Sequence, residues 1–492
     1  MKVLLLGSGG REHALALLIA GSSMEPRIAV LSDKRNPGLV EAAEKTGGRF
    51  YPGKPTSPGD ALRAAEDWSP DLVVVGPEEP LFAGVADALR EKGFTVYGPS
   101  RAQARIEKDK AYARGLMWRY RIPGRLRYQV FTDPREASEY ARAAGDVVVK
   151  PARQAGGRGV RVFAEPMEHL GVAVRGAAGS YAEKLAREVR EKYSDIDYLV
   201  IVEERVEGVE YTVMAVTDGS TLVPLPVVQD HPHLFSWDLG PETGGMGAVS
   251  GPGVVPPFLE LCEYRETAVI LEKTVEALRR ETGEPYRGTI SGQMMLTSLW
   301  GPTVIEYYAR FGDPETGNLL PMLRSDFLEL LDRAASGRLA GYRLEVDNDV
   351  YVVNIALAPA GYPNNRALAR GHPVAVDRDA VERQGCRLLY AGVDQGPSGL
   401  VSTGSRLVEI VCWSSQSYEK AAARAQRAAE AVRLLDGHPL VWRRDIGQRS
   451  HIESRVALAE RVRKAYRRRR ARGETRIYDW IPGRGLIVHD YG

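Results

Sequence analysis

One stretch near the middle of the chain, VIEYYARFGDPE at 304–315, concentrates side chains that could do chemistry. If this run is extended, alternate side chains share a face, so Glu306, Tyr308 and Arg310 lie together on one face of the strand. The residues between them are mostly apolar and lie on the other face. The pattern therefore predicts a strand with a functional site on one face and protein core on the other.

Two glycine-rich turns could hold phosphate. Gly7-Ser-Gly9-Gly10-Arg11-Glu12 follows an apolar run and precedes a helical pattern, so backbone N–H groups meet at a helix start, where an anion can bind. Glu12 stands where the dinucleotide fingerprint needs its third glycine, and a plain strand-to-helix turn is an equal alternative. In the second turn, Gly156-Gly157-Arg158-Gly159 follows Lys150 and could fold over a polyphosphate, with an ordinary hairpin turn as the alternative.

A possible nucleotide slot follows in YLVIVEERVEGVEYTVMAV, 198–216. The segment predicts a buried strand, a short acidic link and a second strand that carries Glu210. Such a layout suits an adenine slot followed by a carboxylate for the ribose, although acidic residues in a link are most often simply solvated.

The elements that position these residues alternate at the start of the chain. Short apolar runs (KVLLLG, RIAVLS, DLVVVGPE, FTVYGPS) flank helical patterns (REHALALLIAG, LFAGVADALREKG). This alternation predicts a parallel sheet, and ligands bind at the carboxyl edge of such sheets. The loops 36–38, 76–81 and 97–100 follow strands at that edge.

Later segments predict one helix over 107–122, ending before Pro123, and another over 417–435, ending at Gly437. Between these helices, strands are expected within 343–363, 386–392 and 406–413.

Composition limits the possible classes. The chain has 492 residues, enough for about three domains, with 66 Lys plus Arg against 64 Asp plus Glu. This balance gives no chain-wide field toward nucleic acid or membrane. No signal peptide and no apolar run of about 18 residues is present. Cys262, Cys386 and Cys412 are far apart, which argues against a zinc ribbon or a disulfide framework and fits a reducing cytoplasm.

Taken in order, seven motifs resemble those of the ATP-grasp phosphoribosylamine–glycine ligases, also called glycinamide ribonucleotide synthetases. They are GSGGREHA (7–14), NPG (36–38), VGPEEPL (75–81), GPETGGMGA (240–248), IEYYARFGDPET (305–316), AGYP (360–363) and RRDIG (443–447). The resemblance runs in register from about residue 1 to 450.

The resemblance implies an α/β fold with an N-terminal parallel-sheet domain, an ATP-grasp core of two α+β lobes that clamp ATP, and a small C-terminal domain. The expected ranges are 1–104, 105–335 with a mobile lid lobe at about 123–205, 336–450, and a basic extension at 451–492. The implied reaction joins glycine to 5-phosphoribosylamine through a glycyl phosphate, with ATP cleaved to ADP and phosphate. Such chemistry needs positioning and charge neutralisation rather than a protein nucleophile.

The resemblance also implies roles for single residues. Arg310 and Lys150 match catalytic positions, where Arg310 steadies the transferring phosphoryl group. ATP-binding positions are Lys110, Lys150, Gly156, Gly157, Arg158, Gly159, Glu203, Glu204, Val206 and Glu210. Substrate-binding positions are Gly9, Gly10, Arg11, Glu12, Asn36, Gly38, Glu78, Asp230, Asp238, Thr243, Gly244, Gly245, Met246, Gly312 and Asp313. Asp313 and Glu315 could instead only fix the turn after Arg310. Pro363 and Arg406 match as loop formers.

The implied cofactors are ATP and Mg²⁺, with Mn²⁺ as an alternative. Glu306 and Gln293 are the candidate metal ligands. The family pattern has Asn where this chain has Tyr308, and a neutral phenol is a poor ligand for Mg²⁺. We therefore expect Tyr308 to pack on the nucleotide or hydrogen-bond near it, with a core aromatic as the alternative.

Two other departures lie near the expected ligands, Glu242 in the GPETGGMG motif and KPARQAGGRG in place of KADGLAAGKG. They leave two alternatives open: a nucleotide-binding paralogue with little ligase activity, regulatory or RNA-associated, and another ATP-grasp carboxylate–amine ligase. GGREHA together with TGGMGA disfavours the second. The expected partners are glycine and 5-phosphoribosylamine, in a cytoplasmic monomer or dimer without membrane or nucleic acid.

The tail is strongly basic. Residues 455–472 contain nine Lys or Arg and one acid, and Val456, Ala459, Val462 and Tyr466 recur at helical spacing. This pattern predicts a helix that docks an apolar stripe on its own protein, with RNA binding as the alternative.

Overall fold

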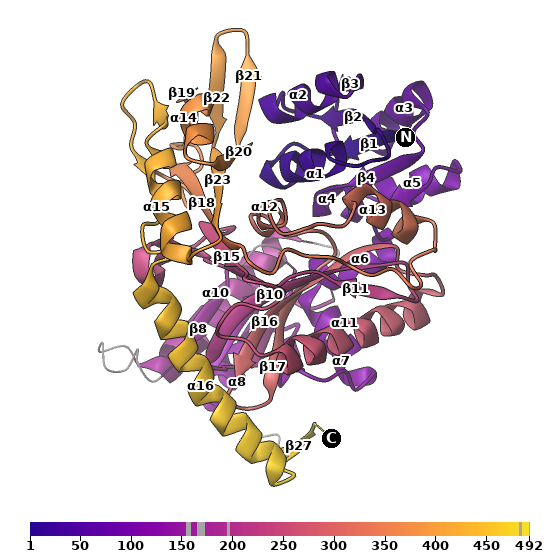
Figure 1. The fold of residues 1–492 in the computed structure, drawn as a ribbon. Helices are drawn as coiled ribbons and strands as arrows, with labels where there is room; N and C mark the ends of the chain where they lie inside the picture. The colour runs from indigo at the N-terminus through magenta and orange to yellow at the C-terminus, as the bar shows by residue number, and fades with distance from the viewer. Residues whose placement is uncertain (154–158, 165–172, 194–196, 482–484, 492) are drawn as a thin grey trace. The chain divides into compact units, whose positions relative to one another are not determined.

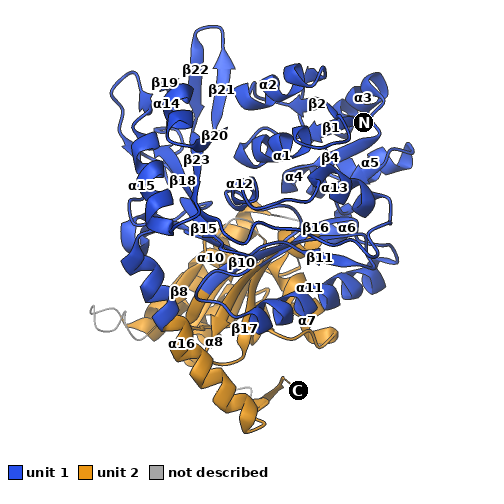
Figure 2. Ribbon diagram, in the orientation of Figure 1, with its two compact units in different colours: residues 1–104, 210–292, 308–457 blue, residues 105–209, 293–307, 458–492 orange. Residues whose placement is uncertain are grey.

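The computed structural model describes residues 1–153, 159–164, 173–193, 197–481 and 485–491. The chain divides into two compact units (Figure 2), each treated separately. Unit 1 comprises Met1–Ala104, Glu210–Gly292 and Tyr308–Ala457, and unit 2 comprises Arg105–Val209, Gln293–Tyr307 and Leu458–Gly492. Among the described residues, no helix is both long and apolar enough to cross a membrane.

Unit 1 begins with the predicted parallel sheet, in the order β3-β2-β1-β4-β5. Its central strands are almost wholly buried because Val, Leu and Ile fill both faces. Helices α1 and α2 lie on one side of this sheet, and α3 and α5 on the other (Figure 1). The bounds are β1 Lys2–Leu6, α1 Gly10–Ala20, β2 Arg27–Ser32, α2 Pro37–Lys45, β3 Arg49–Pro52, α3 Pro58–Trp68, β4 Leu72–Val75, α4 Glu78–Phe82, α5 Val85–Glu91 and β5 Val96–Tyr97.

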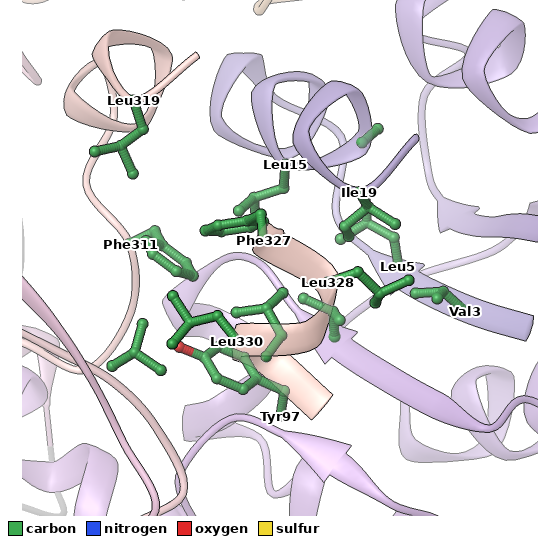
Figure 3. Packing of buried hydrophobic residues seen from close by; sticks show 14 of the residues in the cluster. Val3, Leu5, Leu15, Ile19, Tyr97, Phe311, Leu319, Phe327, Leu328 and Leu330 are labelled. Atoms are coloured by element: carbon green, nitrogen blue, oxygen red, sulfur yellow. The ribbon is translucent and has the colours of Figure 1, made fainter. Parts of the chain in front are cut away.

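A hydrophobic cluster ties this domain to the segment that follows the RFGDPE motif (Figure 3). Val3 and Leu5 of β1 lie in the same cluster as Phe311 and as Phe327 of α13 (Phe327–Ala335). Burying each large side chain contributes about 1.5–3 kcal/mol, so the residue directly after Arg310 is anchored firmly. The core therefore holds the backbone of the predicted site.

The rest of unit 1 is built on an antiparallel sheet whose order from β16 is β16-β10-β12-β15-β18-β23-β20. A separate four-stranded sheet has the order β21-β22-β19-β24. The bounds are β10 Gly208–Thr217, β11 Leu222–Pro224, β12 Val228–Asp230, β13 His233–Phe235, η1 Ser236–Asp238, β14 Leu239–Glu242, β15 Gly247–Ser250, α11 Leu261–Thr282, β16 Gly288–Thr297, α12 Glu315–Asn318, β18 Tyr351–Pro359, β19 Arg370–Val376, α14 Arg378–Arg383, β20 Cys386–Tyr390, β21 Val393–Gly396, β22 Gly399–Thr403, β23 Val408–Ser414, α15 Tyr418–Ala429, β24 Val432–Leu434 and β25 Leu440–Val441.

Unit 2 contains a four-stranded antiparallel sheet in the order β6-β9-β7-β8, with α8 and α10 packed on its apolar core. Residues 293–307 add the second half of β16 and nearly all of β17, and the tail adds most of the long helix α16 and a hairpin. The bounds are α6 Arg101–Lys108, α7 Lys110–Arg119, β6 Tyr128–Phe131, α8 Pro134–Ala144, β7 Val147–Pro151, β8 Arg161–Phe163, α10 Val174–Lys192, β9 Val200–Glu204, β17 Gly301–Tyr308, α16 Arg449–Ala471, β26 Arg476–Ile481 and β27 Gly485–Asp490.

Three predicted helices differ from the structure. The helix at 107–122 begins anew at Lys110, because the Asp109 side chain accepts from the N–H of Tyr112 and caps α7. The helix over 81–93 is broken before Val85, where Gly84 has a positive φ of 79°. Helix α15 ends at Ala429, since Val432 pairs with Val376 in the sheet and this tertiary pairing overrides local helix propensity.

The prediction against disulfides is wrong for one pair. Cys386 and Cys412 stand directly opposite each other on β20 and β23, with their Cα atoms 4.3 Å apart, and form a disulfide bond. They are 26 residues apart in sequence, so no motif spacing marks them. Antiparallel pairing brought them together, which only the sheet register reveals. Cys262 is exposed and is not disulfide-bonded.

Candidate functional site

Unit 2 contains a buried charge network centred on Glu203. Its carboxylate lies 2.7 Å from the Arg114 guanidinium and 2.8 Å from the Lys150 ammonium. Strand β9 supplies the acid, β7 supplies Lys150 and α7 supplies Arg114. Burial alone raises the pKa of Glu203, but the two cations outweigh burial and lower it to about 2. The carboxylate therefore stays ionised and holds Lys150 in place.

Lys110 and Glu306 form a second ion pair in unit 2. A small cavity of about 10 Å³ is lined by both residues, together with Arg114 and Glu203. Gln293 is buried on β16, the strand beside β17 in the sheet order. One carboxylate and one amide oxygen are hard ligands of the kind Mg²⁺ accepts when phosphate oxygens and waters complete its shell. No cluster of three or more His, Cys, Asp or Glu suited to a metal occurs among the described residues.

The predicted adenine link is irregular backbone at 205–207, between β9 and β10. Glu204, the last residue of β9, accepts from the Arg127 N–H at 2.9 Å and from Arg127 Nε at 2.6 Å. Val206 lies within the irregular link. Gly159 is described, whereas Gly156, Gly157 and Arg158 of the predicted lid lie outside the described residues.

In unit 1, Arg310 and Arg11 converge on Glu78. Arg310 Nε donates to Glu78 Oε2 at 3.2 Å, and Arg11 Nη1 lies 3.6 Å from the same oxygen. Both guanidinium groups also donate to the carbonyl oxygen of Phe311, at 3.1 and 3.2 Å. Burial raises the pKa of Glu78, but Arg310 and Arg11 lower it below its usual value. Two fixed cations and one carboxylate thus come from three distant motifs.

The predicted alternation is confirmed in part: Tyr307 and Ala309 are buried, while Glu306, Tyr308 and Arg310 are partly exposed. Ile305, expected on the buried face, is partly exposed as well, and β17 ends at Tyr308. The Arg310 guanidinium lies over the Tyr308 ring, 4.4 Å from its centroid. Tyr308 therefore supports Arg310 through a cation–π contact, a role that neither sequence hypothesis included.

Asp313 is paired with Arg406 in unit 1. Arg406 Nη1 also donates to the carbonyl oxygens of Gly244 and Gly245, at 2.9 and 2.8 Å, and so joins the TGGMG loop to the RFGDPE turn. Gly245 has a φ of 103°, and a Cβ there would lie 2.5 Å from Pro314, so glycine is required. This arrangement gives Asp313 and the loop from Thr243 to Met246 fixed positions.

Two buried glutamates lie beside these residues. Glu315 accepts from Thr212 at 3.4 Å, and burial together with Asp230 raises its pKa to about 7. Glu409 accepts from Asn354 at 3.1 Å, and burial together with the Asp313 carboxylate raises its pKa well above the usual value. Both side chains therefore favour the protonated form, unlike Glu203.

The N-terminal motifs mainly build their own loops. Glu12 accepts from the Gly9 N–H at 2.7 Å and from Arg11 Nε at 2.6 Å. Asn36 caps α2 by accepting from the Gly38 N–H at 3.0 Å. A Cβ on Gly38 would lie 1.9 Å from the His13 ring, and one on Gly10 would lie 2.6 Å from Glu409. These glycines allow close packing, and substrate binding here remains a prediction.

Two other predicted residues have different surroundings. Asp238 pairs with Arg443 at 2.8 Å and with Arg455, and His451 lies 3.7 Å away. The contacts of Asp238 thus belong to a separate cluster of unit 1, without Arg11, Arg310 or Asp313. Glu210 lies on β10, and its carbonyl accepts from Gln229 at 2.9 Å. Glu242 pairs in register with His233 in the β13–β14 hairpin.

Three family models match this chain in succession. They describe the N domain of phosphoribosylglycinamide synthetase at residues 1–107, its ATP-grasp (A) domain at 108–316 and its C domain at 352–449. The chain belongs to the phosphoribosylglycinamide synthetase family. The matched domains contain the Glu203 network of unit 2 and the residues that converge on Glu78 in unit 1. They do not include the tail after residue 449.

Named relatives agree with this family over nearly the whole chain. A phosphoribosylamine–glycine ligase from Methanopyrus kandleri is 40% identical over 470 residues, covering 94% of this chain and 99% of the relative. One from Pyrococcus furiosus is 38% identical over 464 residues, covering 94% and 98%. The crystal structure of phosphoribosylamine–glycine ligase from Thermotoga maritima has a TM-score of 0.71 at 27% identity, covering 90% of this chain and all of that one.

The wider fold matches as well. A biotin carboxylase from Campylobacter jejuni, solved as a β,γ-ATP complex, has a TM-score of 0.64 at 14% identity and shows only the shared fold. The predicted α/β architecture with an ATP-grasp core is therefore confirmed. ATP-grasp relatives bind ATP or ADP, and one is described as a complex with the magnesium salt of ADP.

Sequence reasoning missed several residues that the structure brings into these contacts. Arg406 was expected only to form a loop, yet it is 8% exposed and joins two motifs. Arg114 and Glu409 were not singled out at all. A charged residue within an apolar run, such as Glu409 in LVEIVCW, was the available signal.

Proposed function

We propose that the chain joins glycine to 5-phosphoribosylamine with cleavage of ATP to ADP and phosphate, in purine biosynthesis. The observation that carries the proposal is the convergence of Arg310, Arg11 and Glu78, which belong to three motifs of this family. The absence of a Ser-His-Asp or Cys-His set from the motifs fits a reaction that needs no protein nucleophile.

The residues present suit each step. The γ-phosphoryl group passes from ATP to a glycine carboxylate oxygen, giving ADP and glycyl phosphate. We assign to Arg310 the neutralisation of charge on that group, and to Lys110 and Lys150 the binding of nucleotide phosphates. The amine of phosphoribosylamine then attacks the carbonyl carbon, phosphate leaves, and the amine nitrogen loses a proton. We expect Asp313, which pairs with Arg406, to contact the amine substrate.

Glu306 and Gln293 would hold Mg²⁺, which supplies positive charge beside the ATP phosphates when bound. Lys110 pairs with Glu306 in the structure, so we expect it to move toward phosphate when nucleotide and metal enter. Mn²⁺ offers the same charge and similar ligand preferences. We infer a cytoplasmic enzyme that acts as a monomer or dimer.

The test is ATP turnover that requires both glycine and phosphoribosylamine, with glycinamide ribonucleotide identified by mass spectrometry. Arg310→Met should lower kcat about 100-fold or more, the usual loss when one charge-stabilising group is removed. Arg338→Met is a matched control, because this exposed arginine pairs only with Asp332 and Ser336 among the described residues. Nucleotide binding without dual substrate dependence would instead identify a low-activity paralogue.

A further inference from the structure

The tail lies beyond the matched family domains, which end at residue 449. In it, α16 buries three of the four residues of the predicted stripe: Ala459 is wholly buried, and Val462 and Tyr466 are 5% and 2% exposed. The fourth, Val456, is half-buried. The hairpin of β26 and β27 follows, and the residues from Leu458 onward belong to unit 2. The expectation that the helix docks on its own protein is confirmed.

Trp300, in the turn between β16 and β17, receives the tail. Arg470 Nη2 donates to the Trp300 carbonyl at 2.6 Å, and the Arg469 guanidinium lies 5.3 Å from the indole centroid. Tyr491 stacks on the same indole, with 3.9 Å between ring centroids. Helix α16 and Tyr491 therefore both contact Trp300.

A second set of contacts fixes the chain end beside α7. Trp118 meets the Tyr491 ring edge-on at 5.4 Å, and the Arg125 guanidinium lies 5.5 Å from its centroid. Arg125 Nη2 also donates to the Asp490 carbonyl at 2.9 Å. Aromatic and cation–π contacts of this kind each contribute favourably and restrict the orientation of the Tyr491 ring.

The hydroxyl of Tyr491 reaches the end of β9. It donates to Glu204 Oε1 at 3.1 Å, the oxygen that also accepts from the Arg127 N–H. Glu204 is adjacent to Glu203, which holds Lys150, and precedes the irregular link at 205–207. Alternation along the strand places the two glutamates on opposite faces. On one face of β9, Glu203 therefore pairs with Lys150, and on the other face Glu204 accepts a hydrogen bond from Tyr491.

We propose that Tyr491 is a positioning residue for the nucleotide site: its hydroxyl holds Glu204 and thereby the hinge that carries adenine. The inference rests on the proposed ATP site. The segment after residue 449 would thereby contribute to the affinity for ATP. Because Arg127 binds the same carboxylate, loss of the hydroxyl should loosen the hinge rather than unfold unit 2.

Tyr491→Phe keeps the ring contacts and removes the hydroxyl. We expect the KM for ATP to rise about threefold to tenfold, as for loss of one hydrogen bond of ordinary net strength, with kcat within twofold and the KM for glycine unchanged. Tyr478→Phe is the matched control, since this tyrosine lies on the same hairpin with 60% exposure and should leave the KM for ATP unchanged.

In a Glu204→Ala background, Tyr491→Phe should have no further effect on the KM for ATP, because the two residues act through one contact. Equal KM values for ATP in Tyr491→Phe and wild type would overturn the inference. So would a parallel loss of kcat, melting temperature and affinity for every substrate, which marks a purely structural role. Calorimetric titration with Mg·ADP measures the same shift in dissociation constant if the proposed ligase activity itself fails.

Discussion

Glu203 of unit 2 and Glu315 of unit 1 are buried to nearly the same depth, at 2% and 4% exposure, yet their pKa values shift in opposite directions. Arg114 and Lys150 flank Glu203 and lower its pKa to about 2. Burial, together with the nearby Asp230 carboxylate, raises the pKa of Glu315 to about 7. Depth of burial therefore does not decide ionisation, and the sign of the nearest charges does.

The difference suits the two halves of the proposed reaction. Unit 2 keeps an ionised acid among cations, and the Glu203 carboxylate holds the Lys150 ammonium. Unit 1 gathers Asp313, Glu315 and Glu409 near arginines, and acids that favour the protonated form coexist with ionised ones. Such a mixture can present both hydrogen-bond donors and acceptors to small polar substrates.

The largest effect is expected when a substitution breaks the charge network around Glu203 in unit 2. Glu203→Gln leaves Arg114 and Lys150 buried without their counter-ion, and should lower the free energy of unfolding by about 3–5 kcal/mol at pH 7. Because the folded pKa is depressed, the wild-type contribution is present above about pH 4.5 and is lost as pH falls through about 2. Urea unfolding measures the loss. The control Glu207→Gln, an exposed acid of the same unit, should change little, and equal losses would contradict the comparison.

A smaller effect is expected in unit 1, where the pH dependence of the unfolding free energy tests the raised pKa of Glu315. Glu315 has a raised folded pKa, so its stabilising contribution is present below about pH 4.5 and is lost as pH rises through about 7. The loss is on the order of 3 kcal/mol, from the difference between the folded and unfolded pKa values. Glu315→Gln should remove this slope from unfolding free energies measured between pH 5 and 8. Glu329→Gln, at a partly exposed glutamate that pairs with Arg333 in the same unit, should retain the slope. Identical slopes in all three proteins would refute the protonated state.

The smallest expected effect concerns Glu409. A glutamine has the shape of a protonated glutamate, so it can accept from Asn354 and donate toward Asp313. Glu409→Gln should therefore change the unfolding free energy at pH 7 by less than about 1 kcal/mol, measured as for Glu203→Gln. A loss as large as that of Glu203→Gln would show that Glu409 is ionised and that the two units do not differ.

Much of the fold followed from local patterns. Apolar runs alternating with helical patterns predicted the parallel sheet, and period-two alternation predicted the faces of Tyr307, Tyr308 and Ala309. Motif order predicted the family and the ATP-grasp core. The helix predicted to reach residue 435 ends at Ala429 instead, because pairing of Val432 with Val376 competes with helix propensity. Local signals fail where a distant strand offers a better partner.

The sequence by itself determined which groups are available: Lys110, Lys150, Arg310 and the glycine-rich turns, because side-chain chemistry and local periodicity are written in neighbouring residues. The tertiary structure decided which groups meet. Arg406 reaches the TGGMG loop across 161 positions, and Tyr491 reaches Glu204 across 287. It also decided the Cys386–Cys412 disulfide and the protonation of Glu203 and Glu315. Pairing and ionisation depend on distances and charges in space, and separation along the chain does not encode them.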